Sequence, residues 1–99
     1  MEDQEKIQNA LKKMFEINKH FFSIVFESGS PTTTKKLVVE KRDDVEKYFS
    51  LMKAADIITW YGISEKYPNG DWTIAFYLKA RGNSEEYIAK IQTLKYIHF

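Results

Sequence analysis

The sequence predicts an α+β protein, a two-layer sandwich in which helices gather on one face of an antiparallel sheet made of two hairpins. Three observations lead to this class. Apolar residues recur at helical spacing in three segments, apolar and polar residues alternate in others, and turn-forming residues join the alternating segments in pairs. The expected order of elements is α-β-β-α-β-β-α, with a short C-terminal strand at 96–99 as an open alternative. That strand would give the stretch from Lys36 onward the β-α-β-β-α-β order of a ferredoxin-like unit.

Composition predicts one domain over residues 1–99. A chain of 99 residues with 43% hydrophobic and 29% charged side chains is long enough to bury a core without disulfides or metal. The formal net charge of +1 gives no strong overall field, which disfavours a nucleic-acid or anionic-membrane partner. Cysteine is absent, which excludes disulfides, thiolate metal sites and cysteine nucleophiles. We see no internal repeat or linker.

The first element is an amphipathic helix over Asp3–Lys19. Asn18 projects to the middle of its apolar arc, and we interpret it as a sign that the helix is already ending. The arc consists of Ile7, Ala10, Leu11, Met14, Phe15 and Ile17.

The first hairpin is expected between residues 20 and 41. In His20–Ser28 the apolar residues Phe22, Ile24 and Phe26 fall at every second position, which predicts a central strand. Gly29–Thr34 is polar and rich in turn residues, and Lys35–Lys41 is a short returning strand.

The second helix is expected to start at Asp43 or Asp44, with Asp43 and Glu46 forming a capping box. Its apolar stripe ends near Asp56 and consists of Val45, Tyr48, Phe49, Met52 and Ala55. 

The last helix begins after Gly82, with Asn83 as N-cap and Glu86 reaching back to it. Tyr96–Phe99 continues it or forms the short strand. The residues that this helix buries are Tyr87, Ile88, Ile91 and Leu94.

The long hairpin Ile57–Ala80 organises the chain and turns at 68–71, where Asn-Gly supplies the positive φ angles of a tight turn. We predict a register that places Ile63 opposite Phe76, so that one face is apolar apart from Glu65. That core face consists of Tyr61, Ile63, Tyr67, Trp72, Ile74, Phe76 and Leu78.

The other face of this hairpin is the candidate interaction site. Trp60, Tyr77, Lys79 and Arg81 lie there, beside Ile58. Tryptophan, tyrosine and arginine are enriched in binding hot spots, so we predict a homodimer or docking onto another protein through this face. The alternative is single-strand nucleic-acid binding by the same aromatic and basic groups, although the segment does not match the RNP1 pattern.

No catalytic, cofactor-binding or metal-ligating residues are predicted, and we do not expect an enzyme. The histidines at 20 and 98 lack partners at ligand spacing, and the acidic pairs at 43–44 and 85–86 fit helix starts. The segment 29–36 has the residue types of a phosphate loop in the wrong order. If Glu65 were buried on the apolar face, its pKa would be raised, as in some general acids. The simpler interpretation is that Glu65 lies near the loop end of the hairpin, where the ribbon leaves the core.

Composition and length also carry a resemblance. Lysine far exceeds arginine, isoleucine and tyrosine are abundant, and cysteine is absent. In these respects the chain resembles the small orphan proteins of filamentous viruses of hyperthermophilic archaea. The resemblance implies a thermostable viral factor in the host cytoplasm. No signal peptide pattern opens the sequence and no apolar run has the length of a membrane span, so an intracellular protein is expected.

Overall fold

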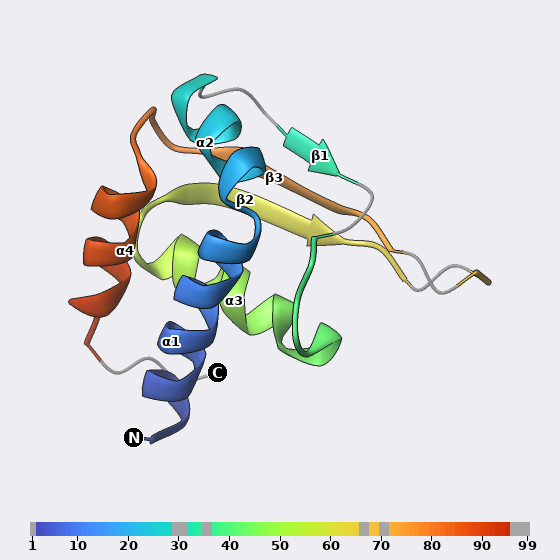
Figure 1. The fold of residues 1–99 in the computed structure, drawn as a ribbon, viewed down its shortest axis with the longest axis horizontal. Coiled ribbons are helices and arrows are strands. Elements are labelled where there is room, and N and C mark those ends of the chain that lie inside the picture. Colours follow the sequence, from blue (N-terminus) through green and yellow to red (C-terminus); the bar gives the residue numbers. More distant parts are fainter. Residues whose placement is uncertain (1, 29–31, 35–36, 66–67, 70–71, 96–99) are drawn as a thin grey trace.

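The computed structural model describes residues 2–28, 32–34, 37–65, 68–69 and 72–95. The α+β class is confirmed, but the order of the described elements is α-α-β-α-β-β-α, with a 3₁₀ turn before the third helix (Figure 1). The elements are α1 (Glu2–Ile17), α2 (Lys19–Ser28), β1 (Thr32–Thr34), η1 (Arg42–Asp44), α3 (Val45–Ala54), β2 (Ile58–Ile63), β3 (Ile74–Leu78) and α4 (Ser84–Gln92).

Asn18 separates α1 from α2, which confirms the prediction that the first helix ends there. Its side-chain amide donates to the Met14 carbonyl at 2.8 Å and to the Val38 carbonyl at 2.9 Å. Its Oδ1 accepts from the Val38 N–H at 3.1 Å. One side chain therefore serves both as a helix end and as the anchor of a distant loop. Ile17, which we placed on the apolar arc, is 51% exposed.

The strand predicted over His20–Ser28 is wrong, because this segment forms α2. Phe22, Val25 and Phe26 are buried, and their i, i+3, i+4 spacing makes one helical stripe. Ile24, which a strand would bury beside Phe22 and Phe26, is 56% exposed. Packing therefore overrides the β preference of an aromatic and β-branched run.

The first predicted hairpin is wrong as a whole. Residues 37–41 form no strand, and residues 35–36 lie outside the described part. Leu37 is buried in the core, and both backbone groups of Val38 bond to Asn18 instead of to a strand ladder. The strand β1 falls inside the predicted loop, where it pairs antiparallel with β3.

The long hairpin is confirmed, with a register that differs from the prediction by two residues. The described sheet has the order β1-β3-β2, and Tyr61 pairs with Phe76 and Ile63 with Ile74. A shift of two keeps every side chain on its predicted face. An irregularity between Ile58 and Trp60 breaks the alternation, so Ile58 is only 1% exposed and the prediction that it lies on the outer face is wrong.

Two parts of the predicted hairpin are not covered in full. Pro68 and Asn69 lie in a turn, whereas Gly70 and Asp71 lie outside the described residues, as does the predicted core residue Tyr67. The predicted turn region is therefore confirmed only in its first half, and the pairing of Tyr67 stays a prediction.

The capping box predicted at Asp43 and Glu46 is wrong. The 3₁₀ turn η1 leads directly into α3, and its last residue, Asp44, takes the N-cap position without a side-chain hydrogen bond. Because the backbone is already helical at Asp44, the side chain lacks the extended geometry of a capping residue. The stripe predicted for α3 is confirmed, since Val45, Tyr48, Phe49, Met52 and Ala55 are all buried.

A Schellman turn joins α3 to β2. Asp56 has a φ of 64°, and its N–H donates to the Lys53 carbonyl at 3.0 Å. The Ile57 N–H donates to the Met52 carbonyl at 2.9 Å, and both of these side chains are buried. The chain therefore reverses sharply, so that β2 returns along α3.

The last helix is confirmed as α4, with Asn83 as its N-cap accepting from the Glu86 N–H at 2.9 Å. Tyr87 and Ile91 are buried, and Ile88 and Leu94 pack half-buried against the core. The alternative strand at 96–99 lies outside the described residues.

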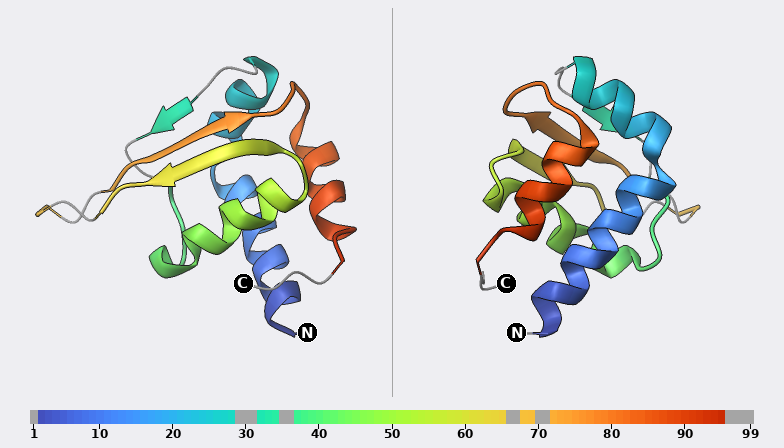
Figure 2. Two further views of the ribbon diagram at one scale, coloured as in Figure 1. Left: turned by 180° about the vertical axis from the view of Figure 1, so that it is seen from behind. Right: turned by 60° about the vertical axis from the view of Figure 1, so that its left-hand side comes forward.

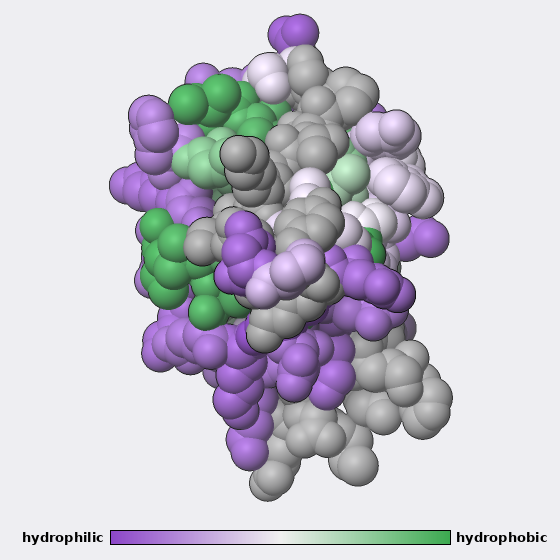
Figure 3. All heavy atoms as spheres, turned by 90° about the vertical axis from the view of Figure 1, so that its right-hand side faces the viewer, coloured by the Kyte–Doolittle hydropathy of each residue, from purple (hydrophilic) through white to green (hydrophobic). Residues whose placement is uncertain are grey.

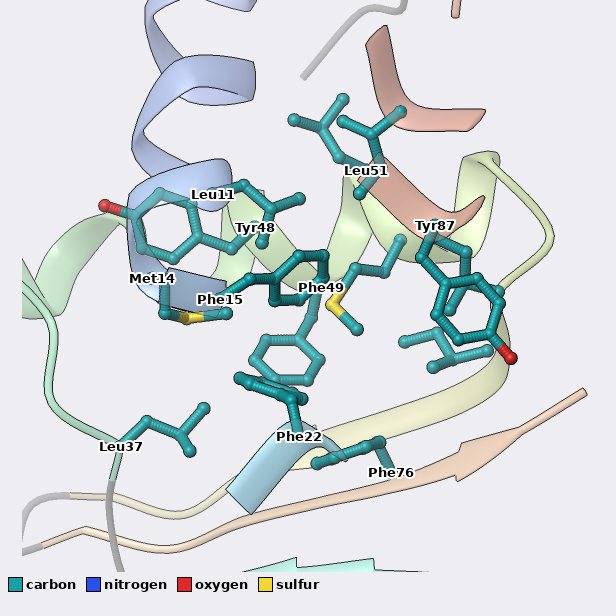
Figure 4. Packing of buried hydrophobic residues seen from close by; sticks show 14 of the residues in the cluster. Leu11, Met14, Phe15, Phe22, Leu37, Tyr48, Phe49, Leu51, Phe76 and Tyr87 are labelled. Atoms are coloured by element: carbon teal, nitrogen blue, oxygen red, sulfur yellow. The ribbon is translucent and has the colours of Figure 1, made fainter. Parts of the chain in front are cut away.

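The helices lie on one face of the sheet (Figure 2), and aromatic rings fill the space between them (Figure 4). Phe76 of β3 lies 5.2 Å from Phe49 of α3 and 6.3 Å from Phe22 of α2, measured between ring centroids. Phe22 in turn contacts Phe15 of α1 edge-on at 4.9 Å. Each buried ring contributes roughly 1.5–3 kcal/mol, so this cluster fixes the helices on one face of the sheet. No helix in the described part of the chain combines the length and the apolarity needed to cross a bilayer.

Candidate interaction site on the outer face of the sheet

The face of the sheet turned away from the helices carries two exposed aromatic side chains. Trp60 is 46% exposed and Tyr77 48% exposed, and their ring centroids lie 5.2 Å apart across the β2–β3 ladder. Strand alternation explains their position, since the flanking residues Tyr61 and Phe76 point to the core. We call Trp60, Tyr77, Lys79 and Arg81 the outer face.

Gly62 determines how Trp60 lies. A Cβ on Gly62 would come within 2.8 Å of Cη2 and 2.9 Å of Cζ2 of the Trp60 indole. The ring therefore lies across the strand backbone at a point that only glycine leaves open. The indole also contacts the Tyr77 ring, and nearly half of the surface of Trp60 stays open to a partner.

Lys79 lies just beyond the end of β3, where its N–H donates to the Ile57 carbonyl at 2.9 Å. Its ammonium group forms an ion pair with the carboxylate of Asp56, which the Schellman turn presents. Because both side chains are more than half exposed, this pair adds little to stability. Its consequence is that the Lys79 charge is already partly neutralised.

Arg81 lies farther along the chain, in the connection between β3 and α4. It is exposed and lines a hollow together with Asp56, Lys79, Tyr87 and Lys90. The structure therefore brings Trp60 and Tyr77 together and places Lys79 at the end of the ladder. Arg81 lines a hollow whose lining includes neither Trp60 nor Tyr77.

A second hollow runs along β2, and sequence reasoning missed it. It is lined by six consecutive residues, 60–65, and by Arg42, Asp43, Glu46 and Lys53 from η1 and α3. Consecutive residues alternate between the two faces of a strand, so this groove follows the open edge of the strand. The spacing of Glu46 and Lys53 shows from sequence that both lie on one side of α3. That this side lies next to β2 could be known only from the fold.

Three contacts join the residues around this groove. The Arg42 guanidinium lies 4.6 Å from the centroid of the Trp72 ring, and its Nη2 donates to the Ser64 carbonyl at 3.4 Å. The hydroxyls of Ser50 and Tyr61 are 2.8 Å apart. η1 and the middle of α3 are thus both tied to β2 and to the residue that follows it.

The remaining sequence candidates have simple roles or lie outside the described part. Glu65 is exposed at the groove end, which fits the loop-end interpretation and not a buried acid. His20 is exposed on α2, and His98 lies outside the described residues. Among the described residues no three acidic, histidine or cysteine side chains come together as a metal site would need.

Apolar atoms are also exposed away from the sheet. Ile17, Ile24 and Val38 are each more than half exposed. Figure 3, which looks at the molecule from the hairpin tip, shows apolar atoms in separate patches with polar atoms between them. They do not form a continuous apolar surface in this view.

Scans of the chain against protein-family models, curated proteins and solved structures found no match. No residue role is therefore carried over from another protein. The roles assigned to the outer face and to the groove rest on their geometry.

Proposed function

We propose that the protein is a small interaction module that binds a protein partner through the outer face. The observation that carries this proposal is the pair of Trp60 and Tyr77, which lie in contact and nearly half exposed on a sheet face that no described helix covers. Aromatic residues of this kind dominate binding energy when a partner removes them from water.

The packing of Trp60 supports the same proposal. The indole lies over Gly62 and against Tyr77 before any partner binds, and a side chain placed by such contacts loses less conformational freedom on binding, so more of its contact energy appears as affinity. Lys79 and Arg81 would supply a polar rim at one end of the face. We also propose that the protein binds without catalysing a reaction, that it acts in the cytoplasm, and that a virus or another mobile element encodes it. Sequence composition alone supports these three points.

The alternative is single-stranded nucleic acid stacking on Trp60 and Tyr77. Two adjacent exposed rings favour this alternative, but few positive charges are available to bind phosphate groups. Lys79 is paired with Asp56, and Arg81 lines a hollow that neither ring lines. Gel-shift assays with single-stranded DNA and RNA test this alternative. Binding that falls steeply with salt and is lost in Trp60→Ala would favour nucleic acid over a protein partner.

Affinity capture from the source cell tests the main proposal. The immobilised wild type is compared with Trp60→Ala/Tyr77→Ala and with Ile24→Ala, a matched loss of an exposed apolar side chain on a different element. We expect a protein that the wild type and Ile24→Ala retain and the double variant loses. Equal capture by all three would contradict a role for the outer face.

A further inference from the structure

The open edge of β2 has the properties of a pairing surface. The sheet order β1-β3-β2 places β2 at an edge among the described strands. The Ser64 N–H donates to the Thr73 carbonyl at 2.8 Å. In an antiparallel pair every second residue bonds to the partner strand, so counting back from Ser64 the residues that bond to β3 are Gly62 and Trp60. The N–H and C=O groups of Tyr61 and Ile63 therefore point away from β3, toward the groove.

Nothing in the sequence of β2 discourages pairing. Edge strands are usually protected by charged residues, proline, short length or a bulge in the middle. The segment Ile58–Ile63 contains neither charge nor proline, and its irregularity lies at its first residues, before Trp60. β1, the other described edge, is only three residues long.

The charges beside this edge are arranged so that the surface complements itself. α3 runs against β2, since Arg42 at its start reaches Ser64 and the Schellman turn after its end leads back to Ile58. Asp43 and Glu46 therefore lie beside the end of β2 and Lys53 beside its beginning, all lining the groove. A two-fold axis near the middle of β2 would bring Lys53 of each copy opposite Asp43 and Glu46 of the other.

We propose that two copies of this chain pair through their β2 edges, antiparallel and around a two-fold axis. The sheet then continues from β2 of one copy into β2 of the other, and the two α3 helices lie side by side in opposite directions, with complementary charges at both ends. Backbone hydrogen bonds of Tyr61 and Ile63 supply the pairing, and the charges select the antiparallel direction. Tyr77, Lys79 and Arg81 of the outer face do not line this groove, whereas Trp60 does, so the test of the pairing changes charges beside the edge and not the aromatic pair.

Charge exchange tests the pairing. Lys53→Glu makes positions 43, 46 and 53 all acidic, and Asp43→Lys/Glu46→Lys makes the three all basic, so in each variant these positions repel those of the other copy at both symmetric ends. Arg42 and Glu65, which also line the groove, are the same in every protein compared. Sedimentation at low salt should show a wild-type dimer, a dissociation constant about tenfold higher or more for each variant alone, and a restored dimer in their equimolar mixture. Lys12→Glu, an exposed charge reversal on α1, should sediment as the wild type does.

Three results would overturn the proposal. The first is a wild type that stays monomeric up to the millimolar range. The second is a mixture no more dimeric than the separate variants, with circular dichroism showing that both are folded. The third is a dimer that Tyr77→Ala breaks and charge exchange leaves intact, which would mean pairing through the outer face instead.

Discussion

Phe76 and Tyr77 are neighbours on β3, yet they have opposite surroundings. Phe76 is 0% exposed and its ring meets Phe22 and Phe49 from two helices, whereas Tyr77 is 48% exposed and its described ring contact is Trp60 on the same sheet. Strand alternation alone produces this difference. The inner face therefore holds the fold together, and the outer face has aromatic surface left for a partner.

Replacing each of the two rings by alanine tests this division most directly. Phe76→Ala leaves a cavity between the sheet and two helices and should lower the free energy of unfolding by about 3–5 kcal/mol. Tyr77→Ala removes one exposed contact with Trp60 and should cost roughly 0.5–1.5 kcal/mol. Urea unfolding followed by circular dichroism measures both. Similar losses for the two variants would show that the outer face also contributes to the core.

The faces of the hairpin were predictable from sequence because a register error of two residues leaves the side-chain faces unchanged. Trp72, Ile74 and Phe76 are buried, and Trp60 and Tyr77 are exposed, as expected. The irregularity before Trp60 was not predictable, since it depends on how the Schellman turn at Asp56 delivers the chain to the sheet.

The segment Lys19–Ser28 shows where sequence reasoning fails. Its phenylalanines fit both a strand and a helix, and the choice was made by distant partners that a sequence window does not contain. Phe26 packs 4.5 Å from Tyr87 and Phe22 meets Phe76, so burial of these rings favours the helix. The groove at β2 escaped prediction for a similar reason, because η1 and α3 reach β2 only in the fold.

Tyr87 sharpens the comparison, because it is an inner aromatic with a polar end. The residue is 4% exposed, and its hydroxyl donates to the Ala80 carbonyl at 2.8 Å. Tyr87→Phe keeps the ring and should lower stability at neutral pH by about 0.5–1.5 kcal/mol, since the carbonyl loses its donor. Urea unfolding at neutral pH measures this loss, and no change would mean that water replaces the hydroxyl.

The same variant has a pH signature. Burial, with a smaller effect of Glu86, raises the pKa of Tyr87 above its ordinary value of 10.0. A raised folded-state pKa stabilises the fold fully below the ordinary value, and this stability is lost as the pH rises through the folded-state pKa. Wild-type stability should therefore fall above about pH 10, and Tyr87→Phe should fall less steeply. The stability of Tyr87→Phe should still fall to some extent at high pH, because burial also raises the pKa of Tyr48.

Gly62→Ala should have the smallest effect on stability and a clear effect on the outer face. The added Cβ meets only the far end of the Trp60 ring, which can swing away, so the free energy of unfolding should stay within about 1 kcal/mol of the wild type. The displaced ring should become easier to quench with acrylamide, measured with Trp72→Phe in both proteins so that only Trp60 emits. Thr59→Ala, at an exposed position of the same strand, should leave quenching unchanged. If Gly62→Ala also leaves quenching unchanged, Gly62 does not hold the ring, and the affinity of the outer face cannot depend on a preorganised Trp60.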